Sequence, residues 1–225
     1  MPMSSVDLTD LATQLRSTNA RDRLLALIAL RSVPAEAAIP LVKMVLHDDH
    51  LPVRSMAIGL LGDKPTPEVY GLLLGLLTQD EDYAARADAA AALGAIADPR
   101  AFEPLVRAFR EDDSWLVQFS AVVSLGNLKE LRARDVLLEA LKQSEEVIQA
   151  AAITALAEIG DVQSVDVLLD FVQSKDWFMR QRLAIALGQL PAPKSQSALR
   201  YLQKDAHPQV AAAASVALQR LADEP

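Results

Sequence analysis

The sequence predicts an all-α fold, an α-solenoid (superhelix) of about seven two-helix repeats. One helical segment recurs seven times at nearly constant spacing, and a second helical segment lies between successive copies. The hydrophobic content is 51% but the aromatic content is only 4%, so the core must be built from small and aliphatic side chains. Helix pairs of this kind bury their apolar stripes only against neighbouring pairs. We therefore expect residues 1–225 to form a single domain.

The most regular copy is DDSWLVQFSAVVSLGNL, at residues 112–128. Asp112, Asp113 and Ser114 are suited to a helix N-cap. Steps of three and four then place one stripe of small or apolar residues on one helix face: Val117, Ala121, Val122, Leu125 and Leu128. Gly126 costs about 1 kcal/mol of helix propensity relative to Ala, which indicates close packing of a neighbouring backbone.

The other copies keep the same register along the chain. Corresponding segments end at Arg31, Gly62, Gly94, Gly126, Ala157, Gly188 and Gln219. The intervals between these ends are 31, 32, 32, 31, 31 and 31 residues, and chance similarity among Ala/Leu-rich helices would not hold such a spacing. The segments between them predict partner helices at 8–15, 39–46, 67–77, 101–109, 133–141, 165–172 and 196–202.

Composition and charge exclude several classes of function. The net charge is −8, which disfavours nucleic acid and anionic membranes and favours a basic partner. The absence of cysteine excludes disulfides and any cofactor held through a thioether. The first ten residues do not have the pattern of a signal peptide, and no apolar run reaches the 18–20 residues or so of a membrane span. We expect a cytoplasmic protein without membrane insertion.

The repeat register predicts which residues of each second helix face outwards, on the concave side of the array. Positions three and seven form a row that is small and apolar: Ser55, Gly59, Ala87, Ala91, Phe119, Val123, Ala150, Thr154, Gln181, Ile185, Ala212 and Val216. Position four adds Met56, Asp88, Ser120, Ala151 and Arg182. A large exposed apolar area is typical of a binding site. Self-association or helix curvature could also cover this face.

Aromatic residues stand two positions before the first buried position of three second helices, at Tyr83, Trp115 and Trp177. An aromatic ring at the edge of a groove is typical of an interaction anchor. The alternative is that each ring packs over the preceding turn. The residues that we predict to bind a partner are Tyr83, Trp115, Phe119, Val123, Trp177, Gln181, Arg182 and Ile185.

An arginine recurs at one register position, in Arg23, Arg54, Arg86 and Arg180, with Gln118 and Gln149 as replacements. An Arg early in the second helix can reach the acidic turn of its own or an adjacent repeat. This column therefore predicts an internal ladder of hydrogen bonds. Arg182 is off the column, near Trp177, and is expected to face the groove, where its counterpart is a carboxylate either of a bound ligand or of an acidic residue of the partner.

Catalytic and metal-binding patterns are weak in this sequence. His47 and His50 share an acidic turn, HDDHLP, but they lack helix-spaced histidines and a fourth ligand. We predict no metal, and no phosphate-binding loop or nucleophile motif occurs. Carboxylates that could assist proton transfer on a bound ligand are Asp88, Asp112, Asp113 and Asp176.

The repeat unit D-x-x-V-R-x-x-A-A-x-A-L-G resembles the phycobilisome-lyase family of HEAT-like repeats over nearly the whole chain. Two stretches, 111–128 (EDDSWLVQFSAVVSLGNL) and 175–191 (KDWFMRQRLAIALGQLP), resemble cyanobacterial phycobilisome-degradation proteins of the NblB type. This resemblance implies binding to phycobiliprotein subunits, and to their bilin chromophores non-covalently, when antenna complexes are dismantled. It also implies a location near the cytosolic face of thylakoids.

Three hypotheses follow. The protein binds phycobiliproteins without chemistry, or it is a bilin lyase or chromophore-detaching enzyme, or it is a generic HEAT-repeat scaffold. The relatives that attach bilins share the expected fold, so the resemblance does not separate attachment from removal. A homodimer is left open.

Overall fold

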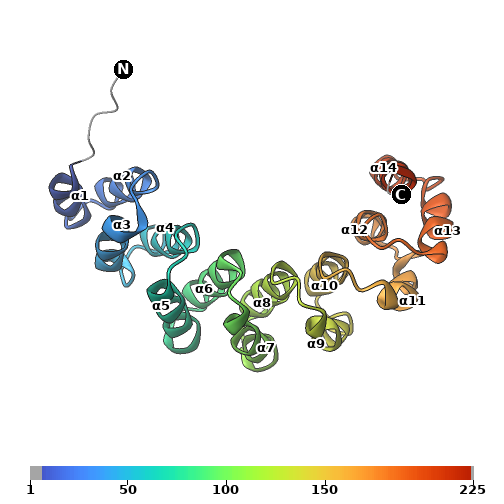
Figure 1. Cartoon of the computed structure of the whole chain (residues 1–225), viewed down its shortest axis with the longest axis horizontal. Helices are drawn as coiled ribbons and strands as arrows, with labels where there is room; N and C mark the ends of the chain where they lie inside the picture. The colour runs from blue at the N-terminus through green and yellow to red at the C-terminus, as the bar shows by residue number, and fades with distance from the viewer. Residues whose placement is uncertain (1–6, 224–225) are drawn as a thin grey trace, which may run out of the picture. The chain divides into compact units, whose positions relative to one another are not determined.

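The computed structural model describes residues 7–223, and regular structure in this range is entirely helical (Figure 1). The chain is an all-α solenoid of seven two-helix repeats within these residues. The second helices of the repeats are α2 Ala20–Leu30, α4 Leu51–Gly62, α6 Tyr83–Ile96, α8 Trp115–Asn127, α10 Glu146–Glu158, α12 Trp177–Leu187 and α14 Pro208–Asp223. This confirms the predicted fold class.

The first helices are less regular than the second ones. They are α1 Leu8–Leu15, α3 Ala35–Val42, α5 Pro67–Gln79, α7 Phe102–Glu111, α9 Arg134–Ala140, α11 Val165–Leu168 and α13 Pro193–Leu202. Short 3₁₀ turns extend four of them: Lys43–Val45, Pro99–Ala101, Leu131–Ala133, and Val162–Ser164 with Leu169–Phe171. Two predicted partner helices were inaccurate for this reason. The segment 39–46 begins earlier, at Ala35, with Pro40 inside the helix, and 165–172 holds only one α-helical turn before it tightens into 3₁₀ geometry.

The chain divides into two compact units, Met1–Ala121 and Val122–Pro225, with the boundary inside α8. We call them unit 1 and unit 2 and describe each by itself. The prediction that residues 1–225 act as one domain stays a prediction. Part of the N-terminal stretch considered for a signal peptide, residues 1–6, lies outside the described residues.

In unit 1 the second helices α2, α4 and α6 pack in succession on one side, and α1, α3, α5 and α7 lie on the other (Figure 1). Fully buried side chains between the two rows include Leu27, Ile58, Leu61, Leu73 and Leu93. Unit 2 repeats this arrangement, with α10, α12 and α14 opposite α9, α11 and α13. In both units the second helices have one side that is turned away from the first helices. We call this side the second-helix face.

Small residues set the spacing between successive second helices. A Cβ atom added at Gly126 would lie 2.8 Å from Cα and Cβ of Ala155, and one at Gly188 would lie 2.6 Å from Cβ of Ala217. Both distances are shorter than a carbon–carbon contact allows, so only glycine fits there. The prediction of close packing at Gly126 is confirmed.

No helix among residues 7–223 combines the length and the apolarity needed to cross a membrane.

Candidate functional site

The predicted outward row of the second helices does lie on the second-helix face, with three exceptions. Gly59, Ala91, Ile185, Ala212 and Val216 are exposed, and most other members of the row are half-buried. Ala87, Ala150 and Ala151 are buried, contrary to the expectation that they line an open surface. Their short side chains lie between adjacent second helices, so the open face in α10 is limited to positions such as Thr154.

The eight residues predicted to bind a partner belong to both units. In unit 1, Tyr83 begins α6, Trp115 begins α8, and Phe119 follows one turn later. In unit 2, Val123 lies on α8, and α12 carries the remaining four: Trp177, Gln181, Arg182 and Ile185. Phe119 and Val123 are half-buried and Ile185 is exposed, so none of these three side chains is sealed inside the protein.

Tyr83 and Trp115 are among the most exposed aromatic residues of unit 1, at 54% and 53%. Neither forms a hydrogen bond or a ring contact with any residue in the described range. A ring that plugs the preceding turn would be largely covered. The exposure of these two rings therefore favours the anchor interpretation over the plug.

Trp177 differs from the other two aromatic residues, because its indole stacks on the imidazole of His207 with ring centroids 4.1 Å apart and an interplanar angle of 11°. His207 precedes α14, and its backbone N–H donates to Asp205 Oδ1 at 2.8 Å. Trp177 thus covers the turn of the following repeat rather than the preceding one. It still exposes 37% of its surface at the start of α12.

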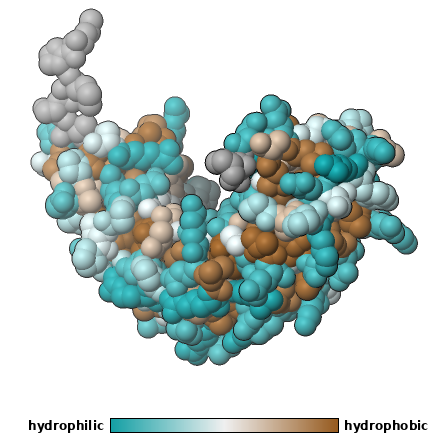
Figure 2. Space-filling view, turned by 45° about the vertical axis from the view of Figure 1, so that its right-hand side comes forward, coloured by the Kyte–Doolittle hydropathy of each residue, from teal (hydrophilic) through white to brown (hydrophobic). Residues whose placement is uncertain are grey.

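A shallow apolar groove of about 360 Å³ lies between α12 and α14. Its lining includes Gln181, Ile185, Ala212, Val216 and Arg220. Val216 is 69% exposed and Ile185 is 40% exposed, which is unusual for aliphatic side chains that have a groove to line. The space-filling view shows such apolar patches in brown between polar ones (Figure 2). We call the groove between these two helices the α12–α14 groove.

Arg182 lies one helical turn before Ile185 on α12 and is half-buried. Its guanidinium Cζ lies 4.8 Å from the centroid of the Phe178 ring, a cation–π arrangement. The guanidinium of Arg182 forms no hydrogen bond or ion pair with any residue from 7 to 223. The five N–H donors of its guanidinium are therefore available to a carboxylate from outside the chain.

The arginine column, in contrast, is engaged inside each unit. Arg23 Nη2 donates to Asp48 Oδ1 at 2.8 Å. Arg86 donates from Nε and Nη2 to the two carboxylate oxygens of Asp112, at 2.7 and 3.0 Å. Arg180 donates to Asp205 from the same two atoms and at the same two distances. Arg54 pairs with Asp82 in the same way. Arg23, Arg54 and Arg180 also donate to a carbonyl of their own turn at 2.7 Å. The predicted ladder is confirmed.

Gln118 and Gln149 keep only part of this ladder. Each amide donates to the carbonyl oxygen six residues earlier, Asp112 and Gln143 respectively, at 2.7 Å. The shorter, neutral side chain thus caps its own turn as the arginines do. For Gln149 no second hydrogen bond to a following repeat occurs among the described residues.

The ladder controls the electrostatics of the acidic turns. The hydrogen bonds from Arg180 hold the pKa of Asp205 below its ordinary value. Burial on its own would raise the pKa of Asp112, but hydrogen bonds from Arg86 and from the Ser114 amide outweigh it and the pKa is lowered. Asp176 accepts the N–H of Phe178 at 3.0 Å as an N-cap. Of the four carboxylates considered for proton transfer, Asp112 and Asp176 thus have structural partners.

No cluster of three or more His, Cys, Asp or Glu side chains that could hold a metal ion occurs among residues 7–223. In the HDDHLP turn, Asp48 is paired with Arg23 and accepts the N–H of His50 at 2.9 Å. The HDDHLP turn thus leads into α4, with His50 at the N-cap position of that helix.

Two exposed residues of the second-helix face, Leu25 and Ile28 on α2, were missed by the sequence reasoning. They occupy positions four and seven of the first repeat, and extending the register by one repeat would have found them. Glu158 was also missed. Its carboxylate lies over Gly126, and burial raises its pKa, although the nearby Lys129 acts in the opposite direction.

Comparison with known proteins gives the following matches. A family model described as HEAT repeats matches residues 8–93, 40–126, 71–151 and 134–219. No curated protein matches significantly. The structure is similar to one in the complex of CpcE and CpcF of phycocyanin lyase from Nostoc sp. PCC7120, with a TM-score of 0.61, 17% identity, and coverage of 98% of this chain and 97% of that one.

Two further solved structures share the fold. Kap95p, in a complex with RanGDP, matches with a TM-score of 0.65 and 17% identity, over 95% of this chain and 35% of that one. An engineered protein matches with a TM-score of 0.55 and 22% identity, over 99% and 69% respectively. At these identities the similarity concerns the fold.

Proposed function

Because this chain belongs to the HEAT-repeat family, we propose that it is an interaction scaffold that binds phycobiliprotein subunits during phycobilisome degradation. The sequence support is the resemblance of residues 111–128 and 175–191 to phycobilisome-degradation proteins. The fold shared with a structure from the CpcE–CpcF complex of phycocyanin lyase is compatible with this assignment.

The observation that carries the proposal is the pairing of an unengaged cation with an exposed apolar groove on α12 and α14. The guanidinium of Arg182 has no hydrogen-bond or ion-pair partner in the described part of the chain, and Ile185 and Val216, which line the groove, are exposed. An aromatic anchor, Trp177, lies at the start of the same helix. This is the composition of a protein-binding patch, in which aromatic and Arg side chains supply most of the binding energy. In this proposal the partner offers an apolar surface with a carboxylate.

A second candidate function is bilin chemistry, as a lyase or as a chromophore-detaching enzyme. Arg182 is suited to the propionate of a tetrapyrrole, and the α12–α14 groove offers about 360 Å³ of space. With no cysteine in the chain, a bilin would be held non-covalently. A generic HEAT-repeat scaffold for unrelated partners is the third candidate.

The test is to mix the purified full chain with holo-phycocyanin and to follow size-exclusion chromatography and visible absorption together. A binding protein co-migrates with phycocyanin and leaves the spectrum unchanged. A lyase or detaching enzyme changes the spectrum and releases or transfers pigment. Absence of both effects would contradict the assignment to phycobiliproteins and leave the generic scaffold.

Two further points concern the location and the oligomeric state of the protein. We place the protein in the cytoplasm, near the cytosolic face of thylakoids, as a partner of phycobilisomes. The elution volume of the protein alone reports whether it is a homodimer.

A further inference from the structure

A second exposed apolar surface lies on the second-helix face of unit 1 and shares no residue with the α12–α14 groove of unit 2. Leu25 and Ile28 on α2 are 51% and 50% exposed, and Met56 on α4 is half-buried. Gly59 on α4 and Ala91 on α6 are exposed, and a Cβ added at Gly59 would meet nothing within 4 Å. With Asp88, these residues form what we call the unit 1 face.

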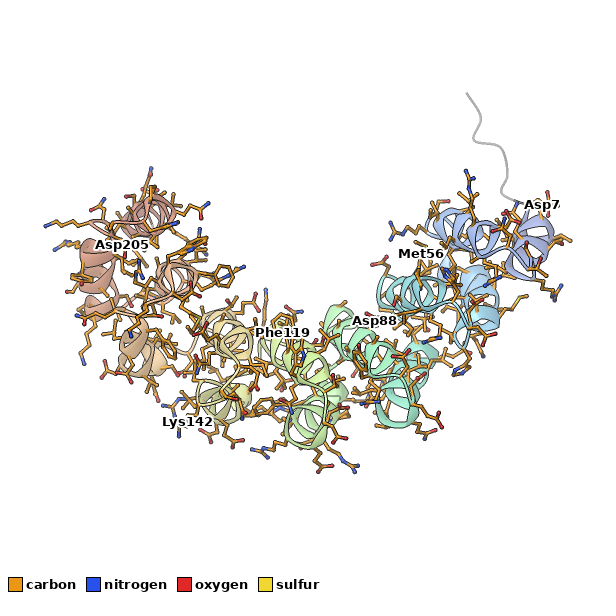
Figure 3. The ribbon with its side chains drawn as sticks, turned by 180° about the vertical axis from the view of Figure 1, so that it is seen from behind. Asp7, Met56, Asp88, Phe119, Lys142 and Asp205 are labelled. Atoms are coloured by element: carbon orange, nitrogen blue, oxygen red, sulfur yellow. The ribbon has the colours of Figure 1, made fainter. Side chains whose placement is uncertain are left out.

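Asp88 is the exception on this apolar face. It lies on α6, which packs against the α4 helix that carries Met56, and Figure 3 shows both residues on the side of these helices turned away from α3 and α5. Its Oδ2 atom is buried and has no hydrogen-bond partner. The side chain of Asp88 forms no hydrogen bond or ion pair within residues 7–223. A carboxylate oxygen that is taken out of water without a partner destabilises the fold, so this residue has no structural role that its contacts would explain.

The two arginines of α4 and α6, the helices that carry Met56 and Asp88, are already engaged. Arg86, two residues earlier, is bound to Asp112, and Arg54 on α4 is bound to Asp82. The unit 1 face therefore presents one negative charge in apolar surroundings. A partner that is complementary to it carries one cation within an apolar surface.

The small number of polar groups on the unit 1 face favours a helix over an extended peptide as the partner. Among positions three, four and seven of α2, α4 and α6, only Ser55 and Asp88 are polar. An extended peptide would lose water from its backbone N–H and C=O groups and find few groups to replace it. A helix satisfies its backbone internally and needs only an apolar face. The small residues Gly59 and Ala91 let such a helix approach closely.

We propose that the unit 1 face binds an amphipathic helix that carries an Arg or Lys at one end of its apolar stripe. The cation pairs with Asp88 on α6, and apolar residues contact Met56 and Gly59 on α4 and then Leu25 and Ile28 on α2. Neighbouring helices pack about 8–10 Å apart, which is close to the roughly 10 Å spanned by seven residues of a helix. The ligand helix therefore spaces the cation and its two apolar contacts by about one heptad each.

The experiment measures binding of fluorescent 18-residue Leu/Ala helices to the full-length protein by fluorescence anisotropy. Each peptide carries Arg, Gln or Glu at one end of the apolar stripe. One set has this residue near the N-terminus of the peptide and a second set has it near the C-terminus, so that both chain directions are tested. We expect the better Arg peptide to bind at least about tenfold more tightly than its Gln version, since a charged pair in an apolar setting contributes 1.4 kcal/mol or more.

Substitutions at Asp88 separate recognition from folding. Asp88→Asn is expected to remove the preference for Arg over Gln without lowering the melting temperature. Asp88→Lys is expected to reverse the preference, so that the Glu peptide binds better than the Arg peptide. Glu103→Gln removes one exposed carboxylate from α7, outside the unit 1 face, and is the matched charge control that leaves the preference unchanged.

A pair of glycine substitutions tests the location. Gly59→Leu fills the proposed contact and is expected to weaken the Arg peptide by about tenfold or more. Gly71→Leu on α5, where an added Cβ also meets nothing within 4 Å, makes the same change away from the face and leaves binding unchanged. Equal affinities for the Arg and Gln peptides, lack of binding by any peptide, or equal effects of the two glycine variants would each overturn the proposal. The test uses no phycobiliprotein, so its outcome is independent of the proposed function.

Discussion

At the scale of single residues, two arginines two positions apart on α12 have opposite roles. Arg180 points back into the repeat and holds Asp205 and the carbonyl oxygen of Ser174. Arg182 lies over Phe178 and holds no acceptor in the described part of the chain. The side chains of Arg180 and Asp205 are only 17% and 8% exposed, so water screens this pair weakly. A residue's partners, rather than its type, therefore separate structural from binding arginines.

Arg182→Ala is expected to weaken phycocyanin binding by about tenfold, because a central Arg of an interface typically contributes 1.4 kcal/mol or more. The melting temperature should stay nearly unchanged, since no hydrogen bond is lost. Arg180→Ala is the matched variant, and it should lower the free energy of unfolding by about 1–3 kcal/mol, as expected when a charged hydrogen-bond partner is removed. Titration calorimetry and thermal unfolding measure the two effects. An equal loss of stability in both variants would make Arg182 a scaffold residue.

Glu158 offers a second test at a single residue. Burial beside Gly126 raises its pKa, with Lys129 opposing the effect. A raised pKa means that the fold disfavours the ionised form of Glu158 relative to the neutral form. The contribution of the neutral form to the free energy of unfolding is therefore present at low pH and is lost as the pH rises through the folded pKa. Glu158→Gln should therefore unfold at a higher denaturant concentration than wild type at pH 7. The difference should disappear below about pH 4, near the pKa of an unfolded Glu. A difference that does not change with pH would contradict this assignment.

At the scale of elements, glycines in the second helices divide into those in contact and those in open space. Gly126 and Gly188 touch the next second helix of unit 2, while Gly59 faces outwards with nothing within 4 Å of an added Cβ. The repeat places small residues where helices approach, but it does not reveal which exposed glycines are dispensable. Packing distances decide that.

A pair of alanine substitutions tests this division. Gly126→Ala should destabilise the protein by about 1–3 kcal/mol, as overpacking does, because the new methyl group would lie 2.8 Å from Ala155. Gly59→Ala should stabilise it by about 0.5–1 kcal/mol through helix propensity. Chemical unfolding of both variants, with circular dichroism at 222 nm or so as the readout, measures the opposite signs. Stabilisation by Gly126→Ala would contradict this, because it would mean that α8 and α10 can move apart at little cost in free energy.

At the scale of the whole molecule, the arginine–aspartate ladder makes the acidic turns a common determinant of stability. Asp48, Asp112 and Asp205 all have a lowered pKa, although burial acts against the shift in each of them and is the largest influence on the first two. Groups of this kind stabilise the fold above the pKa of an unfolded Asp, near 3.9. Their contribution is lost as the pH falls through the folded pKa.

Acid unfolding should therefore begin below about pH 4 and be steep, because several turns lose their ion pairs together. Arg180→Gln removes one partner and should lower stability at pH 7 while making it less dependent on pH between 5 and 3. The curves of the variant and of wild type should converge at low pH. Urea unfolding at a series of pH values gives both curves, and parallel curves would exclude the ladder as the cause.

The single-domain prediction is testable at the same scale. Each repeat of a solenoid is stabilised by its neighbours, so a continuous array of this length is expected to unfold in one cooperative transition. Differential scanning calorimetry of the full chain should give one peak whose calorimetric and van't Hoff enthalpies agree. Two resolved peaks would assign separate domains to residues near 1–121 and 122–225.

The sequence alone determined the helical fold, the seven repeats and the arginine ladder, because these depend on local capping, apolar periodicity and a register that repeats every 31 or 32 residues. It could also indicate the outward positions, since that register assigns them. The tertiary structure decided which of those positions are open: Ala87, Ala150 and Ala151 are covered by neighbouring helices, whereas Ile185 and Val216 are not. It alone separated the partnered Asp112 from the unpartnered Asp88, because partners come from residues about one repeat away in the chain. Exposure and pairing are properties of neighbours in space, and the spacing of residues in one chain does not specify them.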